Sequence, residues 1–345
     1  MLYNLAKPFI FKLEAERAHG LTIAGLKTLP MGPAPKSDPI LATTVAGLDF
    51  VNPVGMAPGF DKNGEVPDAL IRMGFGFAEV GTLTPLPQAG NPKPRIFRLV
   101  EDKAVINRLG FNNQGQQDAL PRLARMRPRM GKGVLGINIG ANKDSSDRIA
   151  DYVIGAKNMA PLADYLTVNI SSPNTPGLRA LQDKGALAEL LAAVMAAMGK
   201  SKTPVFLKVA PDLEPADIDD IVDVATAQKI AALIISNTTI TRPDLLSRNR
   251  TETGGLSGAP LKDLALQRLR DFRTASGGQI PLTGVGGIAT AEDAYERIRA
   301  GASLVQLYTA MIYEGPTIAA TMACQLAKLL KRDGFKNVAE AVGTA

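Results

Sequence analysis

The sequence contains no tryptophan, one cysteine and one histidine. A single cysteine cannot form an intrachain disulfide, and one cysteine with one histidine cannot supply the soft ligands of a zinc site. We therefore predict a reducing compartment and no metal site. Cys324 lies in an apolar run near the C-terminus, far in sequence from the polar loops, so we expect it to be a buried packing thiol.

Aromatic residues are also scarce, at 5% of the chain. Proteins that hold single-stranded nucleic acids stack bases on aromatic side chains and gather Lys and Arg in basic grooves. Here Lys and Arg are scattered, although they exceed Asp and Glu by 39 − 33 = 6. The excess of base permits an anionic small ligand or an anionic membrane surface, and nucleic-acid binding is disfavoured.

Long hydrophobic runs are missing as well, since none reaches the roughly 18 residues of a membrane span. Two helices are expected within residues 1–30, the second at about 20–29. The first has apolar residues at helical spacing, namely Leu2, Leu5, Ala6, Phe9, Ile10 and Leu13. Such a basic amphipathic segment can lie on a membrane surface. Packing on the body of the protein is the equally weighted alternative.

After a Pro-rich linker at 31–36, strand-like and helix-like runs alternate to the end of the chain. The strands are expected at 53–57, 77–81, 134–139, 165–170, 204–209, 232–236, 280–284 and 303–307. The helices are expected near 65–73, 115–127, 147–159, 186–198, 215–228, 260–275 and 291–299, with a last one after 315. Eight mostly continuous apolar strands, each followed by a helix, indicate an α/β fold, a closed (β/α)8 TIM barrel over residues 31–345.

Two further stretches, 40–51 and 95–105, indicate antiparallel hairpins added to the barrel. An open doubly wound sheet is the competing architecture. It would more naturally carry a Gly-rich fingerprint after its first strand, and the Gly-Phe-Asp-Lys-Asn-Gly sequence at 59–64 is not one.

Polar residues follow nearly every predicted strand. At 165–177 the sequence YLTVNISSPNTPG changes from a strand to a polar loop, because Pro173 cannot continue a sheet ladder. Taken alone, this stretch is typical of a strand end with Asx and Ser turns. The loops after all eight strands of a barrel share one mouth, however, so Asn169, Ser172 and Asn174 are expected to meet the polar groups of the other loops.

The Gly-Val-Gly-Gly sequence at 284–287 follows the seventh strand, where barrels commonly bind phosphate. Backbone N–H groups that no side chain shields make a phosphate cradle, although a tight turn needs the same glycines. With Lys62, Lys208 and many asparagines in the same mouth, a flat cofactor such as flavin mononucleotide (FMN) fits. An enzyme that binds a phosphosugar would also use the phosphate cradle, but that ligand does not account for so many asparagine side chains.

At this point the motifs resemble those of dihydroorotate dehydrogenase, in order and over essentially the whole chain. The matching stretches are PGFDKNG at 58–64, NRLGFN at 107–112, GINIGANK at 136–143, NISSPNTPG at 169–177, SNTT at 236–239, GGLSG at 254–258, GVGG at 284–287 and AGASLVQLYT at 300–309. The N-terminal helices and Ser172 look like the membrane-associated, quinone-using class 2, because the soluble classes commonly place a cysteine at that serine.

The resemblance implies a function and a location. The chain would be an FMN-dependent enzyme that oxidises dihydroorotate to orotate in pyrimidine biosynthesis and passes the electrons to a membrane quinone. It would lie peripherally on the cytoplasmic face of the inner membrane, with residues 1–30 forming the quinone tunnel. Among the alternatives, a soluble enzyme of the family would use fumarate or NAD. A tRNA dihydrouridine synthase needs a cysteine acid in the mouth, where Cys324 does not lie. A membrane adaptor has no use for polar strand ends.

The resemblance also implies residue roles. FMN would be held by Pro58, Gly59, Phe60, Asp61, Lys62, Thr82, Asn138, Asn169, Lys208, Ser236, Gly258, Gly287, Tyr308 and Thr309. Dihydroorotate would be held by Lys62, Asn107, Arg108, Leu109, Gly110, Phe111, Asn169, Asn174, Asn237 and Thr238. The quinone would face His19, Arg98 and Tyr308. Ser172 would remove the C5 proton while hydride leaves C6 for the flavin, and we hypothesise that Thr175 and a water relay that proton. At Ser236 the family usually has threonine, which offers the same hydroxyl.

Overall fold

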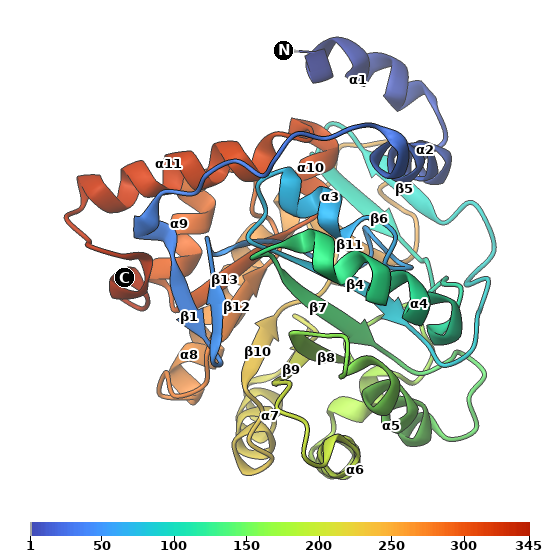
Figure 1. Ribbon diagram of the computed structural model, residues 1–345. Coiled ribbons are helices and arrows are strands. Elements are labelled where there is room, and N and C mark those ends of the chain that lie inside the picture. Colours follow the sequence, from blue (N-terminus) through green and yellow to red (C-terminus); the bar gives the residue numbers. More distant parts are fainter. Residues whose placement is uncertain (1) are drawn as a thin grey trace.

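The core of the structure, a computed structural model, is a closed barrel of eight parallel strands (Figure 1). The structure describes residues 2–345, except for the side chains of Leu2 and Asn4. In sequence order the strands are β3 (Val54–Met56), β4 (Phe77–Leu83), β7 (Val134–Ile139), β8 (Tyr165–Asn169), β9 (Val205–Val209), β10 (Ala232–Ile235), β12 (Leu282–Val285) and β13 (Ala302–Leu307). Each strand pairs with the next in this order, and β10 pairs with β12 and β13 with β3. The predicted TIM barrel is confirmed.

Helices lie outside the strands and cover the barrel (Figure 1). They are α3 (Pro67–Arg72), α4 (Gln116–Met126), α5 (Arg148–Met159), α6 (Lys184–Met198), α7 (Pro215–Ala227), α8 (Lys262–Ala275), α9 (Ala291–Arg299), the short α10 (Thr309–Glu314) and α11 (Ile318–Arg332). Because both faces of each barrel strand are covered, β4, β7, β8 and β9 are buried at every residue.

Aromatic rings close the end of the barrel where the strands begin. Tyr165 stacks on Phe206 with ring centroids 4.3 Å apart, and Phe77 meets Phe50 edge to face at 5.3 Å. Gly136 makes room for this layer, since a Cβ there would lie 2.2 Å from Tyr165 Cζ. Phe50 belongs to the predicted hairpin of β1 (Thr43–Val45) and β2 (Leu48–Phe50). Ligands therefore enter from the opposite end, where the strands finish.

A small antiparallel sheet lies at that opposite end. It contains β5 (Ile96–Leu99) and β6 (Ala104–Asn107), which form the predicted hairpin, and β11 (Gly255–Gly258). The third strand, β11, was not predicted, because its Gly-Leu-Ser-Gly sequence is short and has no strand periodicity. It pairs with β6 and buries Leu256 against Leu99 and Ile106.

The two N-terminal helices, α1 (Leu2–Lys12) and α2 (Ala15–Thr28), extend beyond the barrel (Figure 1). The second begins earlier than predicted, because the Glu14 carboxylate accepts hydrogen bonds from the first backbone N–H groups of the helix. One side of α1 touches the body, while Leu5 is 71% and Phe9 70% exposed. Across residues 2–345 we find no helix with both the length and the apolar character of a bilayer span.

Cys324 is exposed on α11, so the prediction of a buried thiol is wrong. The apolar run does form a helix, and its buried face is carried by neighbours such as Met322, Ala323 and Leu326. Cys324 directly follows a buried alanine, and successive helical residues point about 100° apart. The residue type indicated burial, but the helical phase places this side chain in solvent.

Candidate active site

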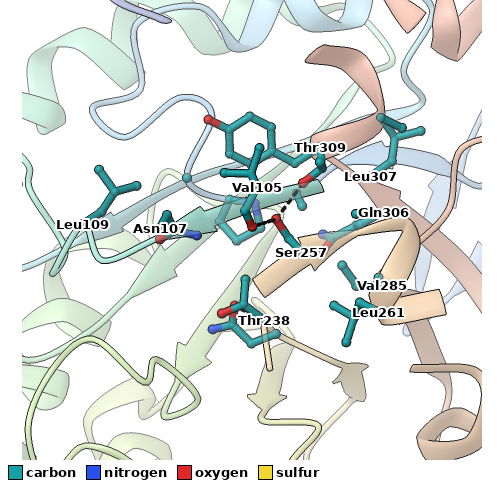
Figure 2. A pocket seen from close by; sticks show the side chains of 18 of the residues that line it. Val105, Asn107, Leu109, Thr238, Ser257, Leu261, Val285, Gln306, Leu307 and Thr309 are labelled. Carbon is teal, nitrogen blue, oxygen red and sulfur yellow. Dashed lines mark hydrogen bonds between the residues drawn. The ribbon is translucent and has the colours of Figure 1, made fainter. Parts of the chain in front are cut away.

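A cavity of about 210 Å³ lies where the barrel strands end, and the small sheet forms one of its walls. Figure 2 shows Ser257 of β11 bonded to Thr309 at the start of α10 and to the backbone of Val105 in β6. The first bond connects the small sheet with α10, which follows the last strand of the barrel, and the second lies within the small sheet. The barrel contributes residues from the ends of most of its strands, including Asn169, Lys208 and Gln306.

Most of the predicted FMN and dihydroorotate residues line this one cavity. They are Pro58, Gly59, Lys62, Thr82, Asn107, Leu109, Gly110, Phe111, Asn169, Asn174, Lys208, Ser236, Asn237, Thr238, Gly258, Gly287, Tyr308 and Thr309, together with the predicted base Ser172. The remaining predicted residues lie outside its lining, and these are His19, Phe60, Asp61, Arg98, Arg108, Asn138 and Thr175.

Asp61 and Arg108 have structural partners that hold them away from the cavity. The buried Asp61 carboxylate accepts hydrogen bonds of 2.8 Å from the backbone N–H groups of Glu65 and Val66, and burial raises its pKa. Arg108 forms an ion pair of 2.7 Å with Glu252 and lies over the Phe97 ring. Both side chains stabilise the local backbone.

The loop after β8 carries the hydroxyl and amide groups of the predicted substrate side. Ser172 is 5% exposed, and its Oγ accepts a hydrogen bond of 3.2 Å from the backbone N–H of Asn174. The Asn174 amide reaches Asn107 of β6 at 3.4 Å. Among the described residues Thr175 Oγ1 is buried without a hydrogen-bond partner. A buried hydroxyl of this kind requires an acceptor or donor such as a water molecule.

Arg179 stabilises the same loop through hydrogen bonds to the backbone. Its guanidinium donates to the carbonyl oxygens of Ser171 and Thr238 at 3.1 Å each, and it forms an ion pair of 2.8 Å with Asp212. One side chain therefore joins the loop after β8 to the loop after β10. This explains how Ser172 and Thr238, far apart in sequence, line the same cavity.

A buried carboxylate, Glu79 of β4, organises the polar groups in the barrel interior, and the sequence analysis missed it. It accepts hydrogen bonds from Asn138 at 2.7 Å, Tyr165 at 3.0 Å and Gln306 at 2.6 Å. Asn138 in turn accepts bonds from the side chains of Thr82 and Asn169 at 2.5 and 3.0 Å. The available signal was a lone acidic residue in an otherwise apolar strand, because charged residues are almost never fully buried without partners.

Lys208 lies in this interior with no hydrogen-bond or ion-pair partner among residues 2–345. Burial lowers the pKa of its ammonium, and the nearby Glu79 carboxylate acts in the opposite direction. Gln306 Oε1 is likewise buried without a partner in the described chain. The cavity therefore presents an unpaired cation and an unpaired amide oxygen to whatever binds there.

The glycine-rich end of the cavity presents unused backbone donors. Gly286 and Gly287 have φ angles of +114° and +69°, which favour glycine, and a Cβ at Gly287 would lie 2.4 Å from Lys262 Cα. Among the described residues no hydrogen bond uses the N–H groups of Gly286, Gly287 or Ile288. This set of free donors has the chemistry of a phosphate cradle.

Lys62 connects this cavity with a second one beside α2. It lines both, and its Nζ lies 3.1 Å from His19 Nε2 in the second. Burial lowers the Lys62 pKa to about 8, and burial followed by the Lys62 charge lowers the His19 pKa to about 3. Phe60 stands edge to face between His19 and Tyr308, at centroid distances of 5.4 and 5.8 Å.

The predicted quinone residues are thus distributed around α1 and α2. Tyr308 lines the main cavity, His19 lines the second, and Arg98 donates to the Leu13 carbonyl at 2.9 Å beneath the junction of the two helices. The main cavity extends to Ile312 and Tyr313, whose carbonyls accept hydrogen bonds from the α1 side chains of Tyr3 and Lys7. One end of the cavity therefore lies against the N-terminal extension.

Comparisons with known proteins agree with this geometry. The family model described as dihydroorotate dehydrogenase matches residues 40–330. A Novosphingobium aromaticivorans protein named dihydroorotate dehydrogenase (quinone) is 64% identical, with 99% of each chain covered, and a protein of the same name from Erythrobacter litoralis is 62% identical over 100% of each. An Eimeria tenella enzyme, solved in complex with ferulenol, has a TM-score of 0.92 at 42% identity, with 95% of each chain covered.

Proposed function

Because the chain belongs to the dihydroorotate dehydrogenase family, we propose that it oxidises dihydroorotate to orotate, using FMN, and delivers the electrons to a membrane quinone. The observation that carries the proposal is that Ser172, Lys62 and Lys208 line one cavity, although they come from three different loops or strands. A hydroxyl and two ammonium groups in one enclosed space match the needs of proton removal beside a flat, electron-accepting ring.

The residues of the cavity fit FMN. The free N–H groups at 286–288 suit its phosphate, and Gly258 and Gly287 allow the close approach of backbone. Lys208 and Gln306 Oε1 suit the polar edge of its ring, since each lacks a partner within residues 2–345. When bound, FMN supplies the capacity to take hydride from the substrate and to pass electrons onward.

Dihydroorotate is assigned to the side of Ser172. The amides of Asn107, Asn174 and Asn237 and the hydroxyl of Thr238 would hold its ring, and Lys62 would pair with its carboxylate. Ser172 Oγ would take the C5 proton. Serine is a poor base, so the proton must move on, and the buried Thr175 hydroxyl with a water molecule is the proposed relay.

The quinone is assigned to the opposite side, between the barrel and the N-terminal extension. There His19, Arg98 and Tyr308 would face its head group, and residues 1–30 would form the tunnel and the membrane-docking surface. Exposed Leu5, Phe9 and Leu21 on α1 and α2, and Leu29 directly after α2, support docking, because these apolar side chains lie in the same segment as the basic Lys7 and Lys12. We propose peripheral attachment to the cytoplasmic face of the inner membrane.

The test is an anaerobic titration of the purified, FMN-loaded protein with dihydroorotate, monitored by the absorption of the bound flavin. The proposal predicts stoichiometric bleaching. Reoxidation is then compared for a ubiquinone analogue, fumarate and NAD, and the quinone analogue should react far faster than the other two. A preparation that remains colourless when supplied with FMN, or a bound flavin that dihydroorotate does not bleach, would contradict the assignment.

A further inference from the structure

The contact between Lys62 and His19 connects the main cavity to α2. Lys62 lies in the loop after β3, and His19 lies on α2, 43 residues earlier in the chain. An ammonium has only donors, so at 3.1 Å His19 Nε2 accepts this hydrogen bond and the ring proton resides on Nδ1. The low pKa of His19 agrees with a neutral ring.

The position of the imidazole is fixed from several directions. Phe60 packs edge to face against the ring with a centroid distance of 5.4 Å. One turn earlier on the same helix, Glu16 forms a two-pronged ion pair with Arg95, with distances of 2.6 and 3.0 Å. Near the end of the helix, Lys27 reaches Glu65 at 2.7 Å. The helix is therefore anchored to the barrel on both sides of His19.

The charges around Lys62 come from four places in the chain. Glu16 from α2, Asp61 from its own loop and Glu65 before α3 favour the ammonium form, whereas Arg95, directly before β5, opposes it. None of these three carboxylates forms an ion pair with Lys62 within residues 2–345. Within the described part of the chain, His19 is the one side chain with a direct hydrogen bond to the Lys62 Nζ.

We propose that His19 is a positioning residue for substrate binding. Its neutral Nε2 accepts a hydrogen bond from the Lys62 ammonium and so orients that ammonium toward the substrate carboxylate. This inference rests on the proposed function, in which Lys62 pairs with that carboxylate. It makes α2, the helix on the quinone side, a structural part of the dihydroorotate site. Loss of the acceptor leaves Lys62 less able to stay charged in its enclosed position, so the affinity for orotate falls, most strongly at alkaline pH.

The first test uses the fact that the chain contains a single histidine. In the holoenzyme labelled with 15N-histidine, NMR reports one imidazole, which must be His19. We expect a neutral ring with an unprotonated Nε2 across the pH range in which a free histidine titrates, and a shift of the Nε2 resonance on addition of orotate and in Lys62→Met. A ring that titrates near the ordinary 6.5, or an Nε2 signal that ignores both changes, overturns the proposal.

The second test measures orotate affinity against pH for the wild type, His19→Gln and His19→Leu. The glutamine oxygen can accept the Lys62 hydrogen bond, so this variant should stay close to the wild type. Leucine cannot, so orotate should bind about tenfold more weakly, and its affinity should begin to fall at a lower pH than in the wild type. Thr22→Ala, an exposed change on the same helix, should match the wild type.

Two results separate this inference from the function on which it rests. If dihydroorotate bleaches the wild-type flavin and the orotate profiles of His19→Leu and the wild type coincide, the role of His19 is refuted and the proposed function survives. If dihydroorotate does not bleach the wild-type flavin, the proposed function itself fails. The NMR measurement of the His19 Nε2 tests the hydrogen bond from Lys62 and does not depend on either of these results.

Discussion

Replacing Glu79 with glutamine keeps the shape of the side chain but changes what it can accept. The two carboxylate oxygens together accept hydrogen bonds from Asn138, Tyr165 and Gln306. An amide has only one oxygen, and its nitrogen must face either the Asn138 amide or the Gln306 amide, which both donate. One buried donor in the barrel interior therefore loses its acceptor, whichever way the new side chain is turned.

The expected loss of stability follows from this single unsatisfied donor, which costs about 1–3 kcal/mol. The entropy of unfolding is about 2.1 cal/mol/K per residue, or roughly 0.7 kcal/mol/K for a chain of 345 residues. The Tm of Glu79→Gln should therefore fall by about 1–4 °C. Lys208 would also lose the Glu79 carboxylate, which favours its charged form, so FMN should bind more weakly and be harder to reduce.

The assay combines thermal unfolding with and without FMN, titration of the apoprotein with FMN and the reduction potential of the bound flavin. Glu189→Gln, an exposed change on α6, is the matched control and should alter none of these values. An unchanged Tm together with wild-type FMN affinity and potential in Glu79→Gln would refute the role assigned to the buried carboxylate.

Four further perturbations test other parts of the site. Ser172→Ala should slow flavin reduction by dihydroorotate by about 10²-fold or more while FMN stays bound, and a near-normal stopped-flow trace would refute its role as base. Lys62→Met should abolish orotate binding yet raise the Tm at neutral pH. Burial lowers the pKa of Lys62 from 10.5 to about 8, so the folded state is penalised below that value, and the gain should shrink as the pH rises from about 8 towards 10.5. Gly287→Ala should weaken FMN binding by tenfold or more, since its Cβ would lie 2.4 Å from a backbone atom, and equal FMN affinity in a direct titration would argue against the phosphate cradle. Removal of α1, residues 2–12, should abolish turnover with long-tail quinones and spare flavin reduction by dihydroorotate, whereas unchanged quinone turnover would contradict the tunnel.

The barrel could be predicted from the sequence because each of its strands is a short, nearly continuous apolar run bounded by polar residues. Strands that are covered on both faces have this pattern. Because the strand ends of a barrel share one mouth, residues as distant in sequence as Lys62 and Thr309 could be predicted to lie together. The strand β11 has too few side chains to show a pattern. Its place depends on pairing with β6, a contact between segments about 150 residues apart that no local signal encodes.

The sequence could predict most of the residues that line the cavity, but not how their side chains are arranged. Asn138 and Asp61, which the resemblance implies as FMN residues, lie outside the cavity lining, where the first donates to Glu79 and the second accepts bonds from a turn, and their role toward FMN stays a prediction. Local sequence cannot distinguish a side chain that points into a cavity from one that supports its wall. The contact of His19 with Lys62 could not be predicted from the sequence either, because it depends on where α2 packs and not on the motif around either residue.

The most direct test of the account is a two-step anaerobic stopped-flow experiment. The first mixing adds one equivalent of dihydroorotate to the FMN-loaded enzyme, and the second adds a ubiquinone analogue to the reduced product, with the α1-deleted variant run in parallel. Both proteins should be reduced at similar rates, and only the full chain should be rapidly reoxidised by the quinone. Equal reoxidation of both proteins, or no reduction in the first step, would contradict the assignment of substrate and quinone to opposite sides of one flavin site.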